Sequence, residues 1–263
     1  MKKHIQFVVA LALSLTMLSS KAQPGMRGGM GAGMGGAPSG PNFSGGMEKL
    51  FGEHQSFSAT LEMHTTASAS GGEVTVPGKL TFSEGSSRFE MDMTEIKGLQ
   101  LKAQDAARMK QMGMANMIAI TSREKKVSWV VYPGLQAYME KPMPEANTTS
   151  SPSDYTVAET EMGKETVDGR DCVKKKVVVT NKEGKAHESL VWKSSEQKSF
   201  PVKIEATEGS STVTMIFKDV KFDKPEASQF APPAEFTKYN DMQSMMMQEM
   251  MKRRGGGRAL PGQ

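Results

Sequence analysis

Residues 56–64 read SFSATLEMH and alternate strictly between polar and apolar side chains. Successive side chains of a β-strand point to opposite faces, so Phe57, Leu61 and Met63 share one face and the polar residues share the other. One apolar and one polar face is typical of an antiparallel sheet that is covered on one side and wet on the other. This stretch therefore predicts one strand of such a sheet.

The same period of two recurs after this stretch, and residues 118–121, 127–132 and 135–139 predict a further meander of strands. In each of the remaining predicted strands, one set of apolar residues shares a face. These sets are Val74, Val76, Leu80 and Phe82; Phe89, Met91 and Met93; Val173, Val177 and Val179; Leu190 and Trp192; Val202, Ile204 and Ala206; and Val213, Met215 and Phe217.

Turns and one irregularity separate these strands. Residues 133–134 (PG) and 167–170 (VDGR) predict tight turns, because they contain the residues that such turns favour. After Phe217 the apolar positions change phase. One extra residue reverses the faces of a strand, so we expect a β-bulge near Lys218 and Asp219.

Two segments predict helices. Residues 101–112 (LKAQDAARMKQM) are rich in helix formers, lack β-branched side chains and end before Gly113, whereas residues 242–254 carry methionines around most of the helix circumference. A sheet of ten or eleven short strands must curl, and its apolar face must be covered. The predicted fold is mainly β: an open, strongly curved antiparallel half-barrel with a helical lid or plug and flexible tails. A two-sheet sandwich is the alternative.

The two ends of the chain differ from this domain. A basic start, a short apolar run and small residues before Gln23 predict that residues 1–22 are a secretory signal peptide cleaved after Ala22, with an uncleaved anchor as the alternative. Residues 23–47 are rich in glycine and methionine and predict a disordered tether. We expect the β-domain over residues 48–240 and a methionine-rich, basic tail, helical or disordered, over residues 241–263.

Composition narrows the function further. Without the signal peptide the chain has 30 basic and 29 acidic residues, a net charge of +1, which does not suggest nucleic-acid binding. The single Cys172 cannot form a disulfide within the chain, and a small buried apolar role is favoured over pairing between chains. The 23 methionines are the unusual feature, because the thioether both adapts to irregular apolar space and binds Cu(I).

Several short stretches resemble an uncharacterised family of exported bacterial proteins that is similar to LolA and LolB, the lipoprotein carrier and receptor of Gram-negative envelopes. They are residues 113–118 (GMANMI), 131–138 (VYPGLQAY), 165–169 (ETVDG) before Cys172, 191–192 (VW), 200–204 (FPVKI), and 230–233 (FAPP) leading to Tyr239. The resemblance covers residues 48–240 and implies an open β half-barrel whose concave apolar face is closed by helices and holds acyl chains. It also implies a periplasmic location.

No constellation in the sequence predicts catalysis. After the signal peptide the histidines are His54, His64 and His187, and none lies in a nucleophile-elbow or zinc-protease motif. His64 alternates with Met63, which indicates a solvent-facing imidazole. Glu90 and Asp92 share the polar face of a strand and are interpreted as solvated charges. We therefore predict a protein that is not an enzyme and that needs no cofactor.

The function predicted from the sequence is a periplasmic binding protein that holds a lipid or another acyl-bearing apolar ligand. The predicted lining residues are Leu61, Met63, Phe89, Met91, Met93, Trp129, Val131 and Trp192, with Ala106, Met109 and Met112 as contacts from a helical lid. A copper-handling protein with methionine-rich tails is the alternative. A purely structural envelope protein without a pocket is the third.

The methionines of residues 242–251 have three possible roles. The sequence favours packing or lipid contact over metal binding, so no metal site is predicted. The basic residues that follow, Lys252, Arg253, Arg254 and Arg258, suggest an anionic membrane surface as a possible partner.

Overall fold

The computed structural model describes residues 43, 45–67, 72–99, 101–143, 151–208 and 211–255. The predicted signal peptide and most of the predicted tether lie outside these residues. In the described part, none of the helices is long and apolar enough to cross a membrane.

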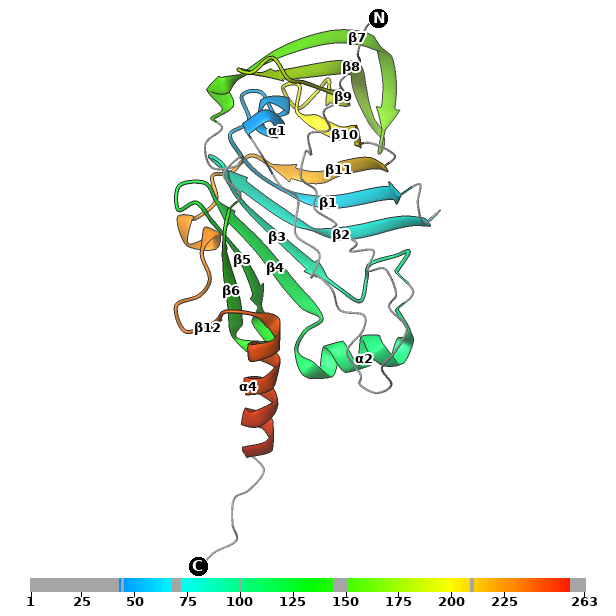
Figure 1. The fold of residues 1–263 in the computed structure, drawn as a ribbon. Helices are drawn as coiled ribbons and strands as arrows, with labels where there is room; N and C mark the ends of the chain where they lie inside the picture. The colour runs from blue at the N-terminus through cyan, green and yellow to red at the C-terminus, as the bar shows by residue number, and fades with distance from the viewer. Residues whose placement is uncertain are drawn as a thin grey trace, which may run out of the picture.

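One sheet of twelve strands dominates the described residues, in the order β12-β6-β5-β4-β3-β2-β1-β11-β10-β9-β8-β7 (Figure 1). The strands are β1 (Ser56–Ala67), β2 (Gly72–Ser83), β3 (Ser86–Asp92), β4 (Asn116–Ser122), β5 (Val127–Tyr132), β6 (Ala137–Pro142), β7 (Tyr155–Val167), β8 (Arg170–Asn181), β9 (Ala186–Ser194), β10 (Pro201–Glu208), β11 (Ser211–Lys221) and β12 (Thr237–Tyr239). All neighbours pair antiparallel except β12 and β6, which are parallel. The prediction of one open, curved sheet is confirmed, and the sandwich alternative is wrong.

Within the described residues, three α-helices and three short 3₁₀ turns accompany the sheet. They are α1 (Gly45–Leu50), α2 (Ala103–Met112), α4 (Met242–Gly255), η1 (Pro133–Leu135), η2 (Pro152–Asp154) and η3 (Ala227–Phe230). Gly113 ends α2 in the left-handed conformation, with φ of 76°, and its N–H binds back to the last turn. Both predicted helices are therefore present. Of the two alternatives for the tail, helical or disordered, α4 shows that Met242–Gly255 is helical.

The predicted irregularities are also confirmed. The register between β1 and β11 shifts between Ser58 and Thr60, opposite Lys221 and Lys218. Asp219 lies there with φ of 50°, so the strand bulges where the apolar phase changes. Asp168 and Gly169, with φ of 50° and 74°, join β7 to β8 in a two-residue turn of the kind that positive φ angles allow.

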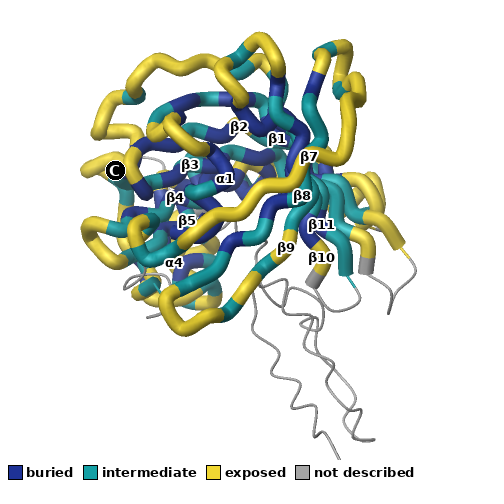
Figure 2. The backbone as a smooth tube through the Cα atoms, turned by 90° about the horizontal axis from the view of Figure 1, so that it is seen from above, coloured by how far each residue is buried: buried dark blue, intermediate teal, exposed yellow. Residues whose placement is uncertain are grey.

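The two faces of the sheet carry separate clusters of apolar side chains. The inner face is the concave side of the curved sheet. It carries Phe57, Leu61 and Met63 of β1, and α1 lies against it (Figure 2). The outer face carries a smaller cluster in which Ile118, Ile120, Trp129 and Val131 pack with Phe230 of η3. Residues 227–236 thus cover part of the face that the sequence predicted to be wet.

The predicted tether ends earlier than its boundary at residue 47. Phe43 is buried, and Gly45–Leu50 forms α1, which lies inside the curl of the sheet. Glycine content predicted a segment that cannot form a core, but Phe43, Met47, Leu50 and Phe51 bury their side chains on the inner face. We call Phe43 and residues 45–51 the N-terminal plug.

Strand β7 was not predicted. Its side chains are exposed on both faces along most of its length (Figure 2), so it shows no alternation of apolar and polar residues. It lies at one edge of the sheet, and among the described strands its partner is β8.

Candidate functional site on the inner face of the sheet

One half of the inner face is filled by phenylalanines. Phe51 of the N-terminal plug is 1% exposed and has its ring centroid 4.9 Å from that of Phe57 and 5.6 Å from that of Phe217. The rings that surround it are Phe43, Phe57, Phe82, Phe200 and Phe217. Aromatic pairs at such distances add about 0.5–1.5 kcal/mol each beyond the burial of area. This phenylalanine half is closed by the chain itself.

A buried ion pair holds the plug in place. Arg123, in the β4–β5 turn, makes a two-pronged contact with the Glu48 carboxylate of α1, and its Nη1 donates to Oε2 at 3.0 Å. Arg123 Nη2 also donates to the Phe43 carbonyl oxygen at 3.4 Å. Glu48 is 3% exposed, and burial raises the pKa of its carboxyl group, against the opposing effect of the Arg123 guanidinium.

The other half of the inner face is lined by methionines. Met63 of β1 lies opposite Met215 of β11, and Met91 of β3 lies opposite Met117 of β4. Twelve of the 23 methionines belong to the main core cluster or pack against it. They are Met47, Met63, Met91, Met93, Met112, Met114, Met117, Met139, Met215, Met242, Met245 and Met246. We call the part around Met63, Met91, Met117 and Met139 the methionine half.

The cover of the methionine half comes from connecting segments and helices rather than from the sheet. The loop after β3 contributes Ile96 and is joined to β2 by the reciprocal backbone bonds of Thr75 and Lys97, both 3.0 Å. At the end of α2, Gly113 lies so close to Gly134 that a Cβ on Gly113 would be 2.5 Å from the Gly134 carbonyl oxygen. Met242, Met245 and Met246 of α4 complete the cover.

A tyrosine adds a hydroxyl group to this apolar surface. Tyr132 of β5 is 3% exposed, and burial raises the pKa of its phenol to about 12. Its hydroxyl therefore stays neutral at physiological pH, so the methionine half gains a polar atom without a charge.

The structure brings most of the predicted lining residues together. Leu61, Met63, Phe89 and Met91 are buried in the main cluster, with Met93 and Met112 packed against it. In α2, Met109 is buried outside both clusters and Ala106 is half-buried. Their contact with a ligand stays a prediction.

Three of the predicted lining residues lie elsewhere. Trp129 and Val131 lie opposite Ile120 and Ile118 and belong to the outer cluster, so their placement on the inner face is wrong. β5 carries apolar side chains on both faces, and residues 127–132 therefore gave no alternation from which the inner face could be chosen.

Trp192 is counted among the buried residues of the main cluster, but its partners across the strands place its ring on the outer side of the sheet, where it lines an outer cleft. It lies opposite Lys174 and Lys203, the Lys203 ammonium is 4.0 Å from its ring centroid, and its indole N–H donates to Glu165 at 2.6 Å. The cleft has a volume of about 430 Å³. Its lining residues are His64, Glu73, Glu165, Thr166, Val167, Trp192, Lys203, Thr214 and Ile216.

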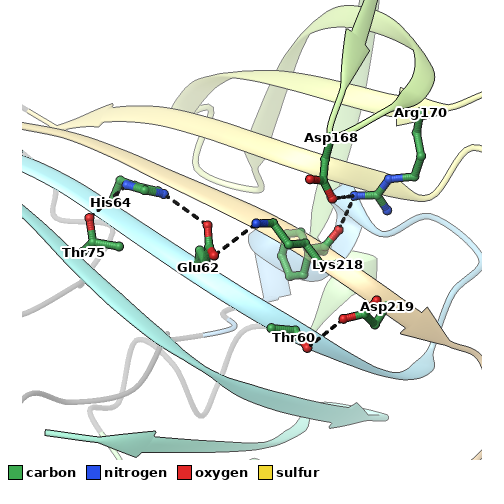
Figure 3. Close-up of polar contacts among 9 residues, drawn as sticks. Thr60, Glu62, His64, Thr75, Asp168, Arg170, Lys218 and Asp219 are labelled. Atoms are coloured by element: carbon green, nitrogen blue, oxygen red, sulfur yellow. Dashed lines mark hydrogen bonds and ion pairs between the residues drawn. The ribbon is translucent and has the colours of Figure 1, made fainter. Parts of the chain in front are cut away.

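Charges in and beside the outer cleft are paired on the strands themselves (Figure 3). The Lys218 ammonium lies 3.1 Å from the Glu62 carboxylate, and the hydrogen bond from Lys174 is the main cause of the lowered pKa of Glu165. His64 Nδ1 lies 3.1 Å from both Glu73 Oε1 and Thr75 Oγ1. The other ring nitrogen, Nε2, lies 3.8 Å from the Glu62 carboxylate, so the imidazole of His64 stands between acidic side chains on both of its nitrogens.

The other titratable residues singled out in the sequence have structural surroundings. Cys172 is 1% exposed, as predicted for a small buried residue, and burial raises the pKa of its thiol. His54 is buried with its ring 4.7 Å from that of Phe222, and Nε2 lies 3.0 Å from the Lys198 carbonyl oxygen. Burial also lowers the pKa of the half-buried His187. Arg88 binds Glu90 at 2.8 Å on the polar face of β3.

The sequence did not identify Phe43, Phe51, Glu48 and Arg123 as important positions. The available signal was two phenylalanines at the end of a glycine-rich segment, since such bulky side chains are not expected in a flexible tether. The pairing of Glu48 with Arg123 spans 75 residues and has no local signature.

Comparisons with known proteins concern the fold. No family model and no curated protein matches the chain. The structure is similar to that of a LolA superfamily protein from Nitrosomonas europaea, with 12% identity, a TM-score of 0.36 and coverage of 71% of this chain and 94% of that one. It is also similar to lipoprotein LppX of Mycobacterium tuberculosis (12% identity, TM-score 0.38, 66% and 91% covered) and LprF of Mycobacterium bovis (12%, 0.38, 72% and 92%).

Proposed function

We propose that this chain is a non-enzymatic periplasmic binding protein that holds a lipid or another acyl-bearing ligand against the methionine half of the inner face. The observation that carries the proposal is the gathering of methionines from β1, β3, β4, β6 and β11 on one apolar surface. Methionine side chains are flexible and polarizable, so they adapt to an apolar occupant of variable shape.

The driving force for such binding is sufficient. Each methylene group transferred from water to an apolar surface contributes about 0.8 kcal/mol, so a chain of ten carbons would contribute roughly 8 kcal/mol before the costs of ordering. Those costs include moving the cover, because Met63, Met91 and Met117 are buried in the structure. The Thr75–Lys97 backbone bridge and the close approach of Gly113 to Gly134 join the cover to the strands and their connections.

The phenylalanine half differs from the methionine half in a way that supports this assignment of the site. Its apolar surface is occupied by the N-terminal plug, and the buried Glu48–Arg123 pair keeps that plug in place. An acyl chain would therefore enter the methionine half, where the cover consists of a loop and the ends of two helices.

Saturable binding of a fluorescent fatty acid to the protein tests the proposal. The change Met91→Glu should abolish binding, because an unpaired charge in an apolar site is costly. Trp129→Phe is the matched control, since Trp129 lies in the outer cluster, and it should bind like the wild type. Absence of saturable binding by the folded wild type, or equal loss in both variants, would contradict the proposal.

A further inference from the structure

The methionines of α4 divide into two sets with different surroundings. Met242, Met245 and Met246 face the domain, where Met245 is fully buried and the other two pack against the main cluster. Met247, Met250 and Met251 are 50%, 55% and 62% exposed. We call these three the outer methionines.

Polar contacts on the domain-facing side of α4 show which side of the helix is turned outward. Tyr239 of β12 donates from its hydroxyl to the Glu249 carboxylate at 3.1 Å, and the Lys252 ammonium binds the same carboxylate at 2.6 Å. Glu249 and Lys252 lie near Met242 and Met245 around the helix. Met247 and Met251 therefore lie on the opposite side, and Met250 lies between them and Met246, on a helix that projects beyond the sheet (Figure 1).

The outer methionines have the spacing of a convergent set of ligands. Residues separated by three and four positions are neighbours on a helix surface, with Cβ atoms about 5–6 Å apart. Each methionine has three rotatable bonds between Cα and its methyl group, so the three sulfurs can approach a common point. Thioether sulfur is a soft donor that prefers Cu(I) to hard divalent cations.

We propose that Met247, Met250 and Met251 form a binding site for Cu(I) on the exposed side of α4, separate from the inner face of the sheet. The sequence favoured packing or lipid contact for this cluster. Packing accounts for the inner three methionines, whereas the side chains of the outer three are at least half exposed. The three thioethers bind the ion without a change of oxidation state and without releasing a proton.

The residue types of α4 favour a soft metal over a membrane surface. Helices that lie in a membrane interface use leucine, phenylalanine and tryptophan on their apolar side. Every large apolar residue of α4 (MQSMMMQEMMKRRG) is methionine, and Gln243, Ser244 and Gln248 are interspersed with the methionines. Substitution by leucine would retain apolar volume at each position but would remove the sulfur, so the choice of methionine has a chemical consequence.

Titration of the full chain with Cu(I) under anaerobic, reducing conditions, against a competing chromophoric chelator, tests the site. The variant Met247→Leu, Met250→Leu, Met251→Leu should lose about one equivalent of Cu(I) relative to the wild type. The matched control Met242→Leu, Met245→Leu, Met246→Leu should retain it. Other methionines of the chain are common to all three proteins and cancel in the comparison. Because leucine and methionine have similar volume and helix propensity, circular dichroism should show equal helix content.

Two results would overturn the proposal. The first is an outer-methionine variant with the same Cu(I) stoichiometry and affinity as the wild type. The second is loss of Cu(I) from the control variant but not from the outer-methionine variant, which would place the ligands on the domain side.

Vesicles of anionic and of neutral phospholipid test the competing role, contact of the outer methionines with a membrane surface. Binding of the wild type to anionic vesicles, equal or stronger in the leucine variant and accompanied by unchanged Cu(I) titrations, would assign the outer methionines to a membrane surface instead.

Discussion

The two halves of the inner face use different side chains to bury the same kind of surface. In the phenylalanine half, planar rings of the sheet surround Phe51, and the Glu48–Arg123 pair fixes the segment that carries it. In the methionine half, flexible side chains meet a cover made of a loop, the end of α2 and the start of α4. A closed aromatic cluster specifies one arrangement, whereas a methionine surface tolerates several. The difference separates the half that is filled by the chain's own aromatic side chains from the half to which we assign the proposed ligand.

The largest expected effect is on the phenylalanine half. Phe51→Ala removes the ring at the centre of the cluster, so the free energy of unfolding should fall by about 3–5 kcal/mol. Urea denaturation followed by tryptophan fluorescence measures it. A loss below about 1 kcal/mol would mean that the cavity collapses easily and that the two halves are equally adaptable.

The ion pair of the plug should have an effect of similar or slightly smaller size. Arg123→Met leaves the Glu48 carboxylate buried without its partner, and breaking a buried pair in this way costs about 3–5 kcal/mol. The double variant Glu48→Gln, Arg123→Met should recover part of that loss. Equal stability of the single and double variants would show that the carboxylate is not held in the apolar interior.

Glu48 also predicts the direction of a pH dependence. Its folded-state pKa is raised above the ordinary value of 4.5, so the folded protein binds the proton more tightly than the unfolded chain. The stabilisation from this group is complete below pH 4.5 and is lost as the pH rises through the folded-state pKa. As the pH rises through that window, the free energy of unfolding of the wild type should fall relative to that of Glu48→Gln. A shift in the opposite direction would indicate that Arg123 outweighs the cost of burial.

The smallest effect is expected in the methionine half. Met117 is fully buried, yet Met117→Leu conserves volume and should change the free energy of unfolding by less than about 1.5 kcal/mol. Fatty-acid binding should persist in this variant. A loss as large as that of Phe51→Ala would remove the contrast between the two halves.

The sheet could be predicted from the sequence wherever one face is apolar and the other polar. Residues 56–64 gave both the strand and the inner face, and the phase change after Phe217 gave the bulge at Asp219. β7 could not be found, because an edge strand exposed on both faces has no alternation. Trp129 and Val131 were placed on the wrong face because β5 is apolar on both.

The site was predictable only in part, for a related reason. The methionine half follows from strand phase, so Met63 and Met91 could be assigned to it before the structure was known. The N-terminal plug depends on contacts between residues far apart in the sequence, such as Phe51 with Phe200 and Glu48 with Arg123. Local composition predicted a tether there, and tertiary packing overrides it at Phe43 and α1.

The most direct test of the central claim is to map where an acyl chain binds. A fatty acid with a photoreactive group at its methyl end is bound to the protein, activated by light and located by peptide mass spectrometry. Labelling is expected at Met91 of β3 and Met117 of β4, within the methionine half. Labelling concentrated on the N-terminal plug or on the outer cluster around Trp129 would contradict the claim.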